Sequence, residues 1–124
     1  MEHDRSDGPR AIAEAYWRDE GARDIDAVMA HYHPDAEFVE PGGRRRVGHD
    51  DIRAYYEASA AAYPGLWVEI LAELVIGDRG ALEWRAELTG HDGTRIPAPG
   101  VNIVEVRDGR FTSVHSYFDT RSIP

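Results

Sequence analysis

The sequence predicts an α+β fold, in which helices pack on one face of an antiparallel sheet. Apolar residues recur at helical spacing in the first half of the chain, and the second half alternates between apolar and polar residues as strands do. Two alternating runs flank Asp108-Gly109, a dipeptide that is typical of tight β-hairpins. The 124 residues suffice for one core but not for two. We therefore expect a disordered lead over residues 1–8 and a single domain over residues 9–124.

Three helices are expected in the first half of the chain. They run from Pro9 to about Gly21, from Asp24 through Tyr32, and from about His49 to Ala62. Proline suits a first helical turn, because its missing N–H would have no partner there, and Asp24 is a common N-cap. The apolar positions of the three helices are Ile12, Ala13, Tyr16 and Trp17; Ile25, Val28, Met29 and Tyr32; and Ile52, Tyr55, Tyr56 and Ala60.

The expected strands start with a short one at Ala36 to Glu40, which the turn at Pro41-Gly42-Gly43 ends. A long strand follows at Leu66 to Ile76, and a clean alternation of apolar and charged residues then runs from Leu82 to Leu88. The closing hairpin adds the last two strands. Long twisted strands tend to curl around what they cover.

Each strand of the closing hairpin presents an apolar face that contains one small polar group. The two faces carry Asn102, Val104 and Val106, and Val114, Ser116 and Phe118. A polar side chain buried on an apolar wall needs a partner, and a ligand atom can be that partner. The alternative is that Asn102 satisfies a neighbouring backbone group. We favour a ligand pocket, because Ser116 places a second polar group opposite the first.

Composition excludes several kinds of chemistry. The chain has no Cys and no Lys, its 14 basic residues all being Arg, which excludes thiol nucleophiles and Schiff bases. A formal net charge of −9 argues against nucleic acid as a partner. No apolar run is long enough to predict a membrane span, and the polar N-terminus does not resemble a secretory signal. We therefore expect a cytoplasmic protein.

No cofactor or metal is expected. The sequence lacks a glycine-rich phosphate loop and a dinucleotide-binding fingerprint. His31 and His33 lie two residues apart, without a third ligand or the spacing of a zinc site. The basic cluster from Arg44 to Arg46 is interpreted as a solvated hairpin tip. Proton transfer and polarisation by neutral donors remain as the chemistry that the residues suggest.

Glu40 is the first candidate for that chemistry. It follows Phe38 on the same side of the short strand and directly precedes the Pro-Gly-Gly turn. A carboxylate held beside apolar groups has its charged form disfavoured, which raises its pKa and makes it a proton acceptor near neutrality. The alternative is an exposed edge-strand Glu, which is our interpretation of Glu37.

Three tyrosines form the second candidate group. Tyr16, Tyr32 and Tyr56 each lie on the apolar stripe of a predicted helix or at its end, so their rings are expected to converge under the sheet. Buried tyrosine hydroxyls usually find a polar partner, and three that converge can form a hydrogen-bonded chain that ends in one donor at a cavity. The alternative is three core aromatics with unrelated partners. His115 alternates with Ser116 and is expected on the face away from the pocket.

The chain resembles the nuclear transport factor 2-like superfamily, which includes ketosteroid isomerases, SnoaL-like polyketide cyclases and limonene epoxide hydrolases. The segments that carry the resemblance are AEAYWRDEGARDIDAVMAHYHPDAEFVEPGG, VGHDDIRAYYEA and VRDGRFTSVHSYFD. The resemblance implies a cone-shaped fold, in which helices close one side of a strongly curved sheet and leave a deep apolar pocket. It also implies a homodimer that forms through the outer face of the sheet. With an Arg-rich and Ala-rich composition, it suggests a GC-rich bacterium and natural-product metabolism.

The ketosteroid isomerases resemble the chain most closely at single positions. Their substrate-oxygen donor corresponds to Tyr16 and their general base to Glu40, which precedes a proline as the family's Asp does. The second oxyanion donor corresponds to Asn102, where the family has a protonated Asp. Tyr32 and Tyr56 match the supporting tyrosines, and Phe118 matches an aromatic pocket position. The Arg and the two Asp residues of the epoxide hydrolases correspond to Trp84, Ala86 and Ser116, so their water-activating set is missing here.

The sequence therefore predicts an enzyme that moves a proton next to a carbonyl of a hydrophobic small molecule, as in double-bond isomerisation through an enolate. One alternative is a SnoaL-like polyketide cyclase or dehydratase, and another is a non-catalytic ligand-binding or dimerisation module. The predicted catalytic residues are Glu40, Tyr16 and Asn102, supported by Tyr32 and Tyr56. The expected pocket residues are Trp17, Met29, Phe38, Trp84, Ser116 and Phe118.

Overall fold

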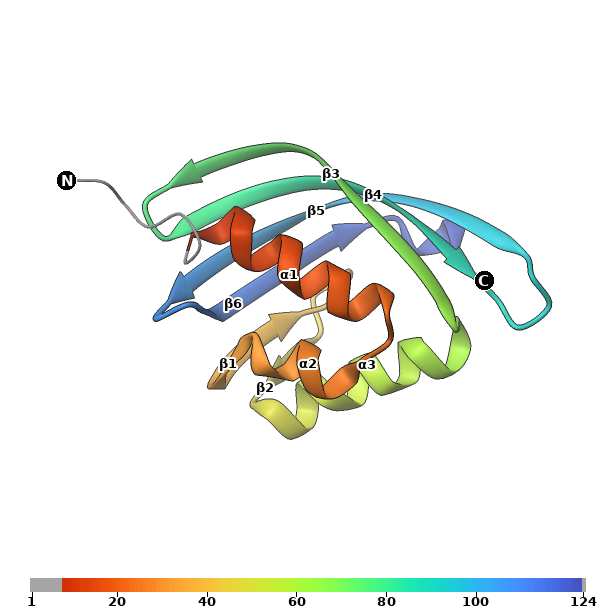
Figure 1. Cartoon of the computed structure of the whole chain (residues 1–124), viewed down its shortest axis with the longest axis horizontal. Helices are drawn as coiled ribbons and strands as arrows, with labels where there is room; N and C mark the ends of the chain where they lie inside the picture. Colours follow the sequence, from red (N-terminus) through yellow and green to blue (C-terminus); the bar gives the residue numbers. More distant parts are fainter. Residues whose placement is uncertain (1–7, 124) are drawn as a thin grey trace.

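A curved sheet of long strands arches over three helices in the computed structural model, which describes residues 8–123 (Figure 1). The helices are α1 (Pro9–Gly21), α2 (Ile25–Ala30) and α3 (His49–Ala62). The strands are β1 (Tyr32–Val39), β2 (Arg45–Val47), β3 (Gly65–Ile76), β4 (Arg79–Thr89), β5 (Arg95–Arg107) and β6 (Arg110–Phe118), and a short 3-10 turn follows at Thr120–Ser122. This is the α+β architecture that the sequence predicts. Apart from Gly8, the expected disordered lead lies outside the described residues.

The helices begin and end for the reasons that the sequence supplies. Pro9 opens α1, and the Asp24 side chain caps α2 by accepting a hydrogen bond from the Ala27 N–H at 3.2 Å. Asp50 and Asp51 lie in the first turn of α3, where the helix dipole favours negative charge. The predicted bounds of the first and third helices are confirmed.

The second helix is shorter than predicted, because Tyr32 does not belong to it. α2 ends at Ala30, and Tyr32 is the first residue of β1. Pro34 explains the difference, since a proline pushes the residue before it into extended backbone and removes a helical donor. The expected strand at Ala36 to Glu40 is correspondingly longer at its start, and Glu40 lies just beyond its end.

The sheet is mixed, with the strand order β2-β1-β6-β5-β4-β3. Four of the five neighbouring pairs are antiparallel, but β1 runs parallel to β6, which corrects the expectation of a purely antiparallel sheet. Alternation of apolar and polar residues reports only the two faces of a strand and carries no information on its direction. The sequence analysis also missed β2, whose three residues are too few to show a period.

The concave face of the sheet carries the core. In β4, Leu82, Trp84, Ala86 and Leu88 are all buried while the charged residues between them face outward, which confirms the predicted alternation. The closing hairpin turns at Asp108 (φ 53°) and Gly109 (φ 76°), and two positive φ angles are what a tight hairpin turn with the twist of the strands requires. The inner residues of β5 and β6 thus come to face the helices.

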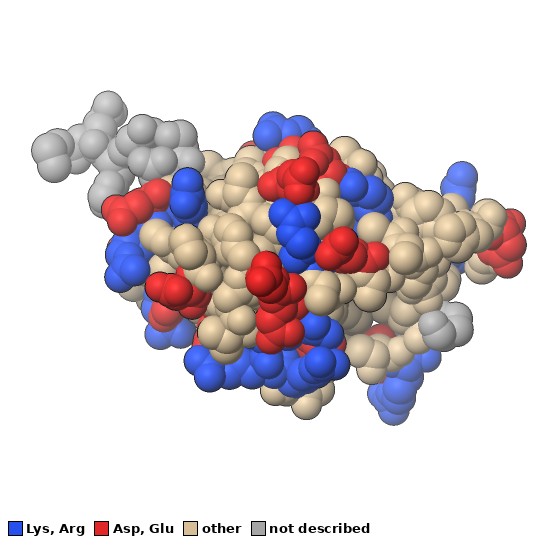
Figure 2. Space-filling view, turned by 90° about the horizontal axis from the view of Figure 1, so that it is seen from below, with Lys and Arg blue, Asp and Glu red and all other residues tan. Residues whose placement is uncertain are grey.

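No helix among the described residues is long and apolar enough to cross a membrane. On the face of the molecule seen in Figure 2, acidic and basic side chains alternate over most of the surface, and basic side chains gather along the lower edge of the view.

Candidate active site

A cavity of about 380 Å³ lies between the helices and the concave face of the sheet. The residues expected at the site that line it are Tyr16, Trp17, Phe38, Glu40, Trp84, Asn102, Ser116 and Phe118. Met29 does not line the cavity. It projects from α2 into the hydrophobic core, where only 2% of it is exposed. The apolar face of α2 therefore packs against other elements and not against the cavity.

The three tyrosines form a continuous chain of hydrogen bonds. The hydroxyl of Tyr56 lies 2.5 Å from that of Tyr16 and 2.5 Å from that of Tyr32, and all three side chains are buried. Of the three, Tyr16 lines the cavity. When Tyr32 donates to Tyr56 and Tyr56 donates to Tyr16, the Tyr16 O–H remains for a ligand or for the nearby Glu20 carboxyl, and each bond polarises the next.

The burial of these tyrosines keeps them protonated. Desolvation raises the pKa of Tyr16 well above its ordinary value, and the negative charge of nearby Glu20 acts in the same direction. Burial likewise raises the pKa of Tyr56 and of Tyr32. Tyr16 can therefore act as a neutral hydrogen-bond donor throughout the physiological pH range, but not as a base.

Asn102 is oriented by a tryptophan on the neighbouring strand. The indole N–H of Trp84 donates to Oδ1 of Asn102 at 3.1 Å, and Asn102 is only 4% exposed. Since an indole nitrogen can only donate, the amide must present its oxygen to Trp84 and keep its NH₂ group for other partners. Ser116 lies directly across from Asn102 in the β5–β6 register. The polar pair predicted from the hairpin faces therefore lies on the cavity wall.

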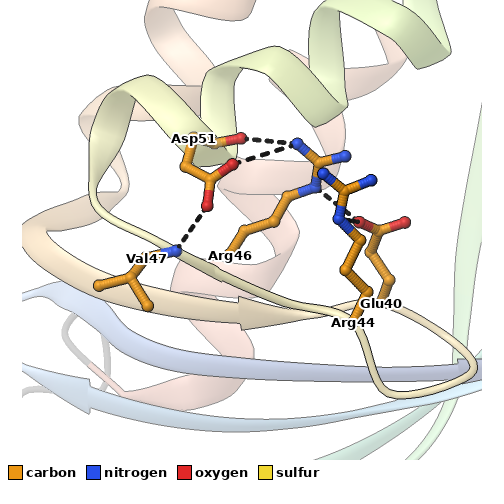
Figure 3. Close-up of polar contacts among 5 residues, drawn as sticks. All are labelled: Glu40, Arg44, Arg46, Val47 and Asp51. Atoms are coloured by element: carbon orange, nitrogen blue, oxygen red, sulfur yellow. Dashed lines mark hydrogen bonds and ion pairs between the residues drawn. The ribbon is translucent and has the colours of Figure 1, made fainter.

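Glu40 is held by an arginine. Nε of Arg46 donates to Oε2 of Glu40 at 2.6 Å, and Arg44 approaches the same oxygen at 3.8 Å (Figure 3). Arg46 is itself fixed on its other side, because Nη1 donates to the Asp51 carbonyl oxygen at 3.1 Å. Glu40 therefore lines the cavity as an ion-paired carboxylate. The expected setting, in which apolar groups alone surround it, is not what the structure shows.

The interpretation of Arg44 to Arg46 as a solvated tip is wrong for Arg46. Its side chain is only 12% exposed, and its guanidinium also lies over the ring of Tyr55, 5.6 Å from the centroid. Arg44 and Arg45 are exposed as expected. Arg46 pairs with Phe38 in the β1–β2 register, which turns it toward the site. A strand this short gave no periodic signal for that placement.

His31, His33 and His115 lie away from the cavity. His115 faces outward as predicted and hydrogen-bonds to Oε2 of Glu37 at 2.7 Å, and this contact is the main cause that lowers the pKa of Glu37. His31 bonds to Asp19, and His33 bonds to the backbone oxygen of Arg107. His31 and His33 therefore serve two different structural contacts.

The model of the SnoaL-like domain family matches residues 13–114. The chain belongs to this family. Among proteins of known identity, the SnoaL-like chain is 35% identical over 97 residues to the ECF RNA polymerase sigma factor SigJ of Mycobacterium tuberculosis. The match covers 72% of the chain but only 30% of SigJ, so the chain spans less than a third of that relative.

Solved structures agree with the fold of the SnoaL-like domain. A Catenulispora acidiphila protein with a ketosteroid isomerase-like fold, solved with trimethylamine, has a TM-score of 0.82 at 19% identity, covering 94% of this chain and 90% of its own. A candidate polyketide cyclase from Xanthomonas campestris has a TM-score of 0.81 at 20% identity and covers 90% of each chain. At these identities the likeness shows the fold alone. It confirms the resemblance that the sequence motifs carried.

Sequence reasoning missed one acidic residue of the site, Glu20. It lies on α1 one helical turn after Tyr16, lines the cavity and is 9% exposed. Burial raises its pKa from 4.5 to about 7, although Arg23 and the Tyr16 hydroxyl oppose the shift. The signal was present in the sequence, since Glu20 continues the apolar stripe of Ile12, Ala13 and Tyr16.

Proposed function

We propose that this SnoaL-like domain is an enzyme that moves a proton on the carbon next to a carbonyl of a hydrophobic small molecule. The observation that carries the proposal is that the tyrosine chain ends at a cavity that Glu40 and Asn102 also line. Aromatic and aliphatic side chains form most of the remaining wall, which suits an apolar substrate. The proposal uses only groups that the chain itself supplies.

In this proposal Glu40 removes the proton and Tyr16 and Asn102 hold the oxygen. As the α-carbon loses its proton to the Glu40 carboxylate, negative charge develops on the carbonyl oxygen. The Tyr16 hydroxyl and the NH₂ group of Asn102 donate to that oxygen, and fixed donors aimed at developing negative charge stabilise an enolate strongly. Arg46 positions the carboxylate and occupies Oε2, which leaves Oε1 for the substrate.

The enolate can lead to more than one product. Return of the proton at a different carbon gives double-bond isomerisation, whereas attack on a second carbonyl gives ring closure. The structural neighbour from Xanthomonas campestris, a candidate polyketide cyclase, favours keeping cyclisation as a second outcome. Both outcomes need the same base and the same oxyanion donors, so the same variants test both.

A non-catalytic ligand-binding module is the competing function. Two observations favour it: the base is engaged in an ion pair with Arg46, and the relative SigJ is named as a sigma factor and not as an enzyme. A protein that only binds would hold ligands in the same cavity without turning them over.

Kinetics with cyclohex-3-enone, a simple β,γ-unsaturated ketone, separate the two functions. We expect Glu40→Gln to lower kcat/KM about 100-fold or more, because it removes the general base. Tyr16→Phe is expected to lower it by a similar factor, because it removes an oxyanion donor. Glu57→Gln is the matched control, since Glu57 is exposed on α3. Equal rates for the wild type and Glu40→Gln would eliminate the mechanism.

A further inference from the structure

Glu20 gives the cavity a second carboxyl group. It projects from the last turn of α1, four residues after Tyr16, and forms part of the cavity wall while remaining 9% exposed. Within residues 8–123, no Arg or His nitrogen lies within 4.0 Å of its carboxyl oxygens. Burial of a carboxyl group without an ion-pair partner destabilises a folded protein, and such groups are concentrated at functional sites.

The groups that face Glu20 are mostly phenols. The charged and titratable groups within range of its carboxyl are Tyr16 on α1, Arg23 after α1, Tyr32 on β1, and Tyr55 and Tyr56 on α3. Arg23 is the one cation among them, and it is turned toward the backbone. Its Nη2 donates to the Tyr63 carbonyl oxygen at 2.6 Å, whereas Nε and Nη1 are buried without a partner among the described residues.

The two carboxyl groups of the cavity therefore have opposite surroundings. Glu40 has a guanidinium nitrogen at 2.6 Å, whereas Glu20 is buried, and the opposing charge of Arg23 does not cancel the effect of that burial on its pKa. Tyr55 lies within electrostatic range of both, since the charges of Glu20 and Glu40 each raise its pKa. Two titratable groups with such unlike environments at one cavity are the arrangement that assigns one as a base and the other as an acid.

We propose that Glu20 is the general acid of this cavity and that, together with Glu40 as the base, it dehydrates a β-hydroxy ketone. This inference rests on the proposed function, because it uses the same base and the same oxyanion donors. It goes further by naming the substrate class, a hydrophobic carbonyl compound with a hydroxyl group on the β-carbon. Isomerisation needs one proton carrier, whereas loss of water needs a proton donor for the departing oxygen.

The reaction is balanced by the groups present. The Cα–H bond of the substrate breaks and its proton passes to the Glu40 carboxylate, while the electron pair forms the enolate held by Tyr16 and Asn102. The enolate then forms the Cα=Cβ bond as the Cβ–O bond breaks. The departing hydroxyl takes the proton of Glu20 and leaves as water. The proton on Glu40 returns to Glu20 through solvent, so the net products are an α,β-unsaturated ketone and water.

The pH dependence of the reaction should carry the signature of Glu20. A general acid works only while it is protonated, and burial places the pKa of Glu20 at about 7. The dehydration rate is therefore expected to fall about tenfold for each pH unit above neutrality. In Glu20→Gln the rate should fall about 100-fold, and the decline above pH 7 should be absent, because no group titrates at that position.

The experiment measures dehydration of the aldol of benzaldehyde and acetone to benzylideneacetone, by absorbance, as a function of pH. Wild type, Glu20→Gln, Glu40→Gln and Tyr16→Phe are compared, with Glu14→Gln as the matched control, since Glu14 is an exposed residue of the same helix. Isomerisation of cyclohex-3-enone is followed in parallel, because it breaks no C–O bond. Carboxyl-resolved NMR of the wild type titrates Glu20 directly and needs no variant to fold.

Each outcome distinguishes this inference from the proposed function. Support requires the decline above pH 7 in the wild type and in Glu14→Gln, and its loss in Glu20→Gln. Retention of the wild-type rate and pH profile by Glu20→Gln would overturn the role of Glu20 while leaving the proposed function intact. The same holds if the wild type isomerises the ketone but does not dehydrate the aldol, or if Glu20 titrates like an ordinary carboxyl group. Turnover of neither compound would overturn both proposals.

Discussion

The burial of Glu20 couples the stability of the whole domain to pH through one residue. Its folded-state pKa of about 7 lies above the ordinary value of 4.5, so between these two pH values the unfolded chain has released a proton that the folded chain still holds. The unfolded state then binds fewer protons, and the free energy of unfolding falls as the pH rises. The stabilisation that protonated Glu20 gives to the folded state is complete below about pH 4.5 and is lost above about pH 7.

Glu20→Gln should therefore stabilise the protein selectively at high pH. The difference between 4.5 and about 7 corresponds to about 3 kcal/mol. Relative to the wild type, we expect the free energy of unfolding of Glu20→Gln to be about 3 kcal/mol larger at pH 8 than at pH 4, because Gln never ionises. Urea denaturation at both pH values measures this. A difference between the two proteins that does not change with pH would contradict the burial of Glu20.

Single residues of the site were predictable where a pattern marked them. Alternation placed Asn102 and Ser116 on the cavity wall, and the family motifs placed Tyr16 and Glu40 there. Arg46 was not predictable, because its partner Glu40 lies across a turn that gives no periodic signal. The ion pair depends on the three-dimensional path of that turn, which composition cannot supply.

At the scale of elements, β4 and β5 pack closely where Trp84 faces Gly100. A Cβ atom at Gly100 would overlap the Trp84 ring and lie 2.7 Å from the carbonyl oxygen of Tyr117. The absence of a side chain at Gly100 thus allows the indole to lie against the sheet, where it hydrogen-bonds to Asn102. The glycine is needed here for close approach and not for an unusual backbone angle.

Gly100→Ala is expected to destabilise the domain by about 2 kcal/mol, as overpacking of a core typically does. Part of that cost should vanish when the ring is removed, so we expect Gly100→Ala to cost about half as much in a Trp84→Ala background. Urea denaturation of the four proteins of this cycle measures the coupling. The same cost in both backgrounds would show that the Tyr117 carbonyl, and not the indole, limits the space at this position.

The elements themselves were predicted unequally. The long periodic segments α1, α3 and β4 were readable because each repeats its pattern over several turns or pleats. The end of α2 and the parallel pairing of β1 with β6 were not, since Pro34 acts locally and strand direction depends on contacts remote in the sequence. Tyr32 nevertheless reaches Tyr56 from a strand, so the predicted tyrosine chain survives the change of element.

At the scale of the whole molecule, the convex face of the sheet exposes large apolar side chains. They include Trp67 (52% exposed), Leu74 (78%), Ile76 (86%), Ile103 (36%) and Tyr117 (53%). The strand registers place them on one face, because the residues that they pair with on the neighbouring strands also point away from the helices. An apolar surface of this extent is typical of a protein interface, and the homodimer expected from the family resemblance would cover it.

We expect the protein to be a homodimer at micromolar concentration, and we expect the double variant Ile103→Glu, Tyr117→Glu to be a folded monomer. Both residues lie on central strands, so in a face-to-face pair their carboxylates would be buried near those of the second copy, and unpaired buried charges are costly. Ala54→Glu, Ala61→Glu is the matched control, because it adds the same charge at exposed positions of α3.

Analytical ultracentrifugation measures the oligomeric state of each protein, and circular dichroism shows whether the variants are folded. A monomeric wild type, or a double variant that still dimerises, would place the assembly surface elsewhere. If the control also dissociates, added charge alone accounts for the effect, and the convex face has no special part in it.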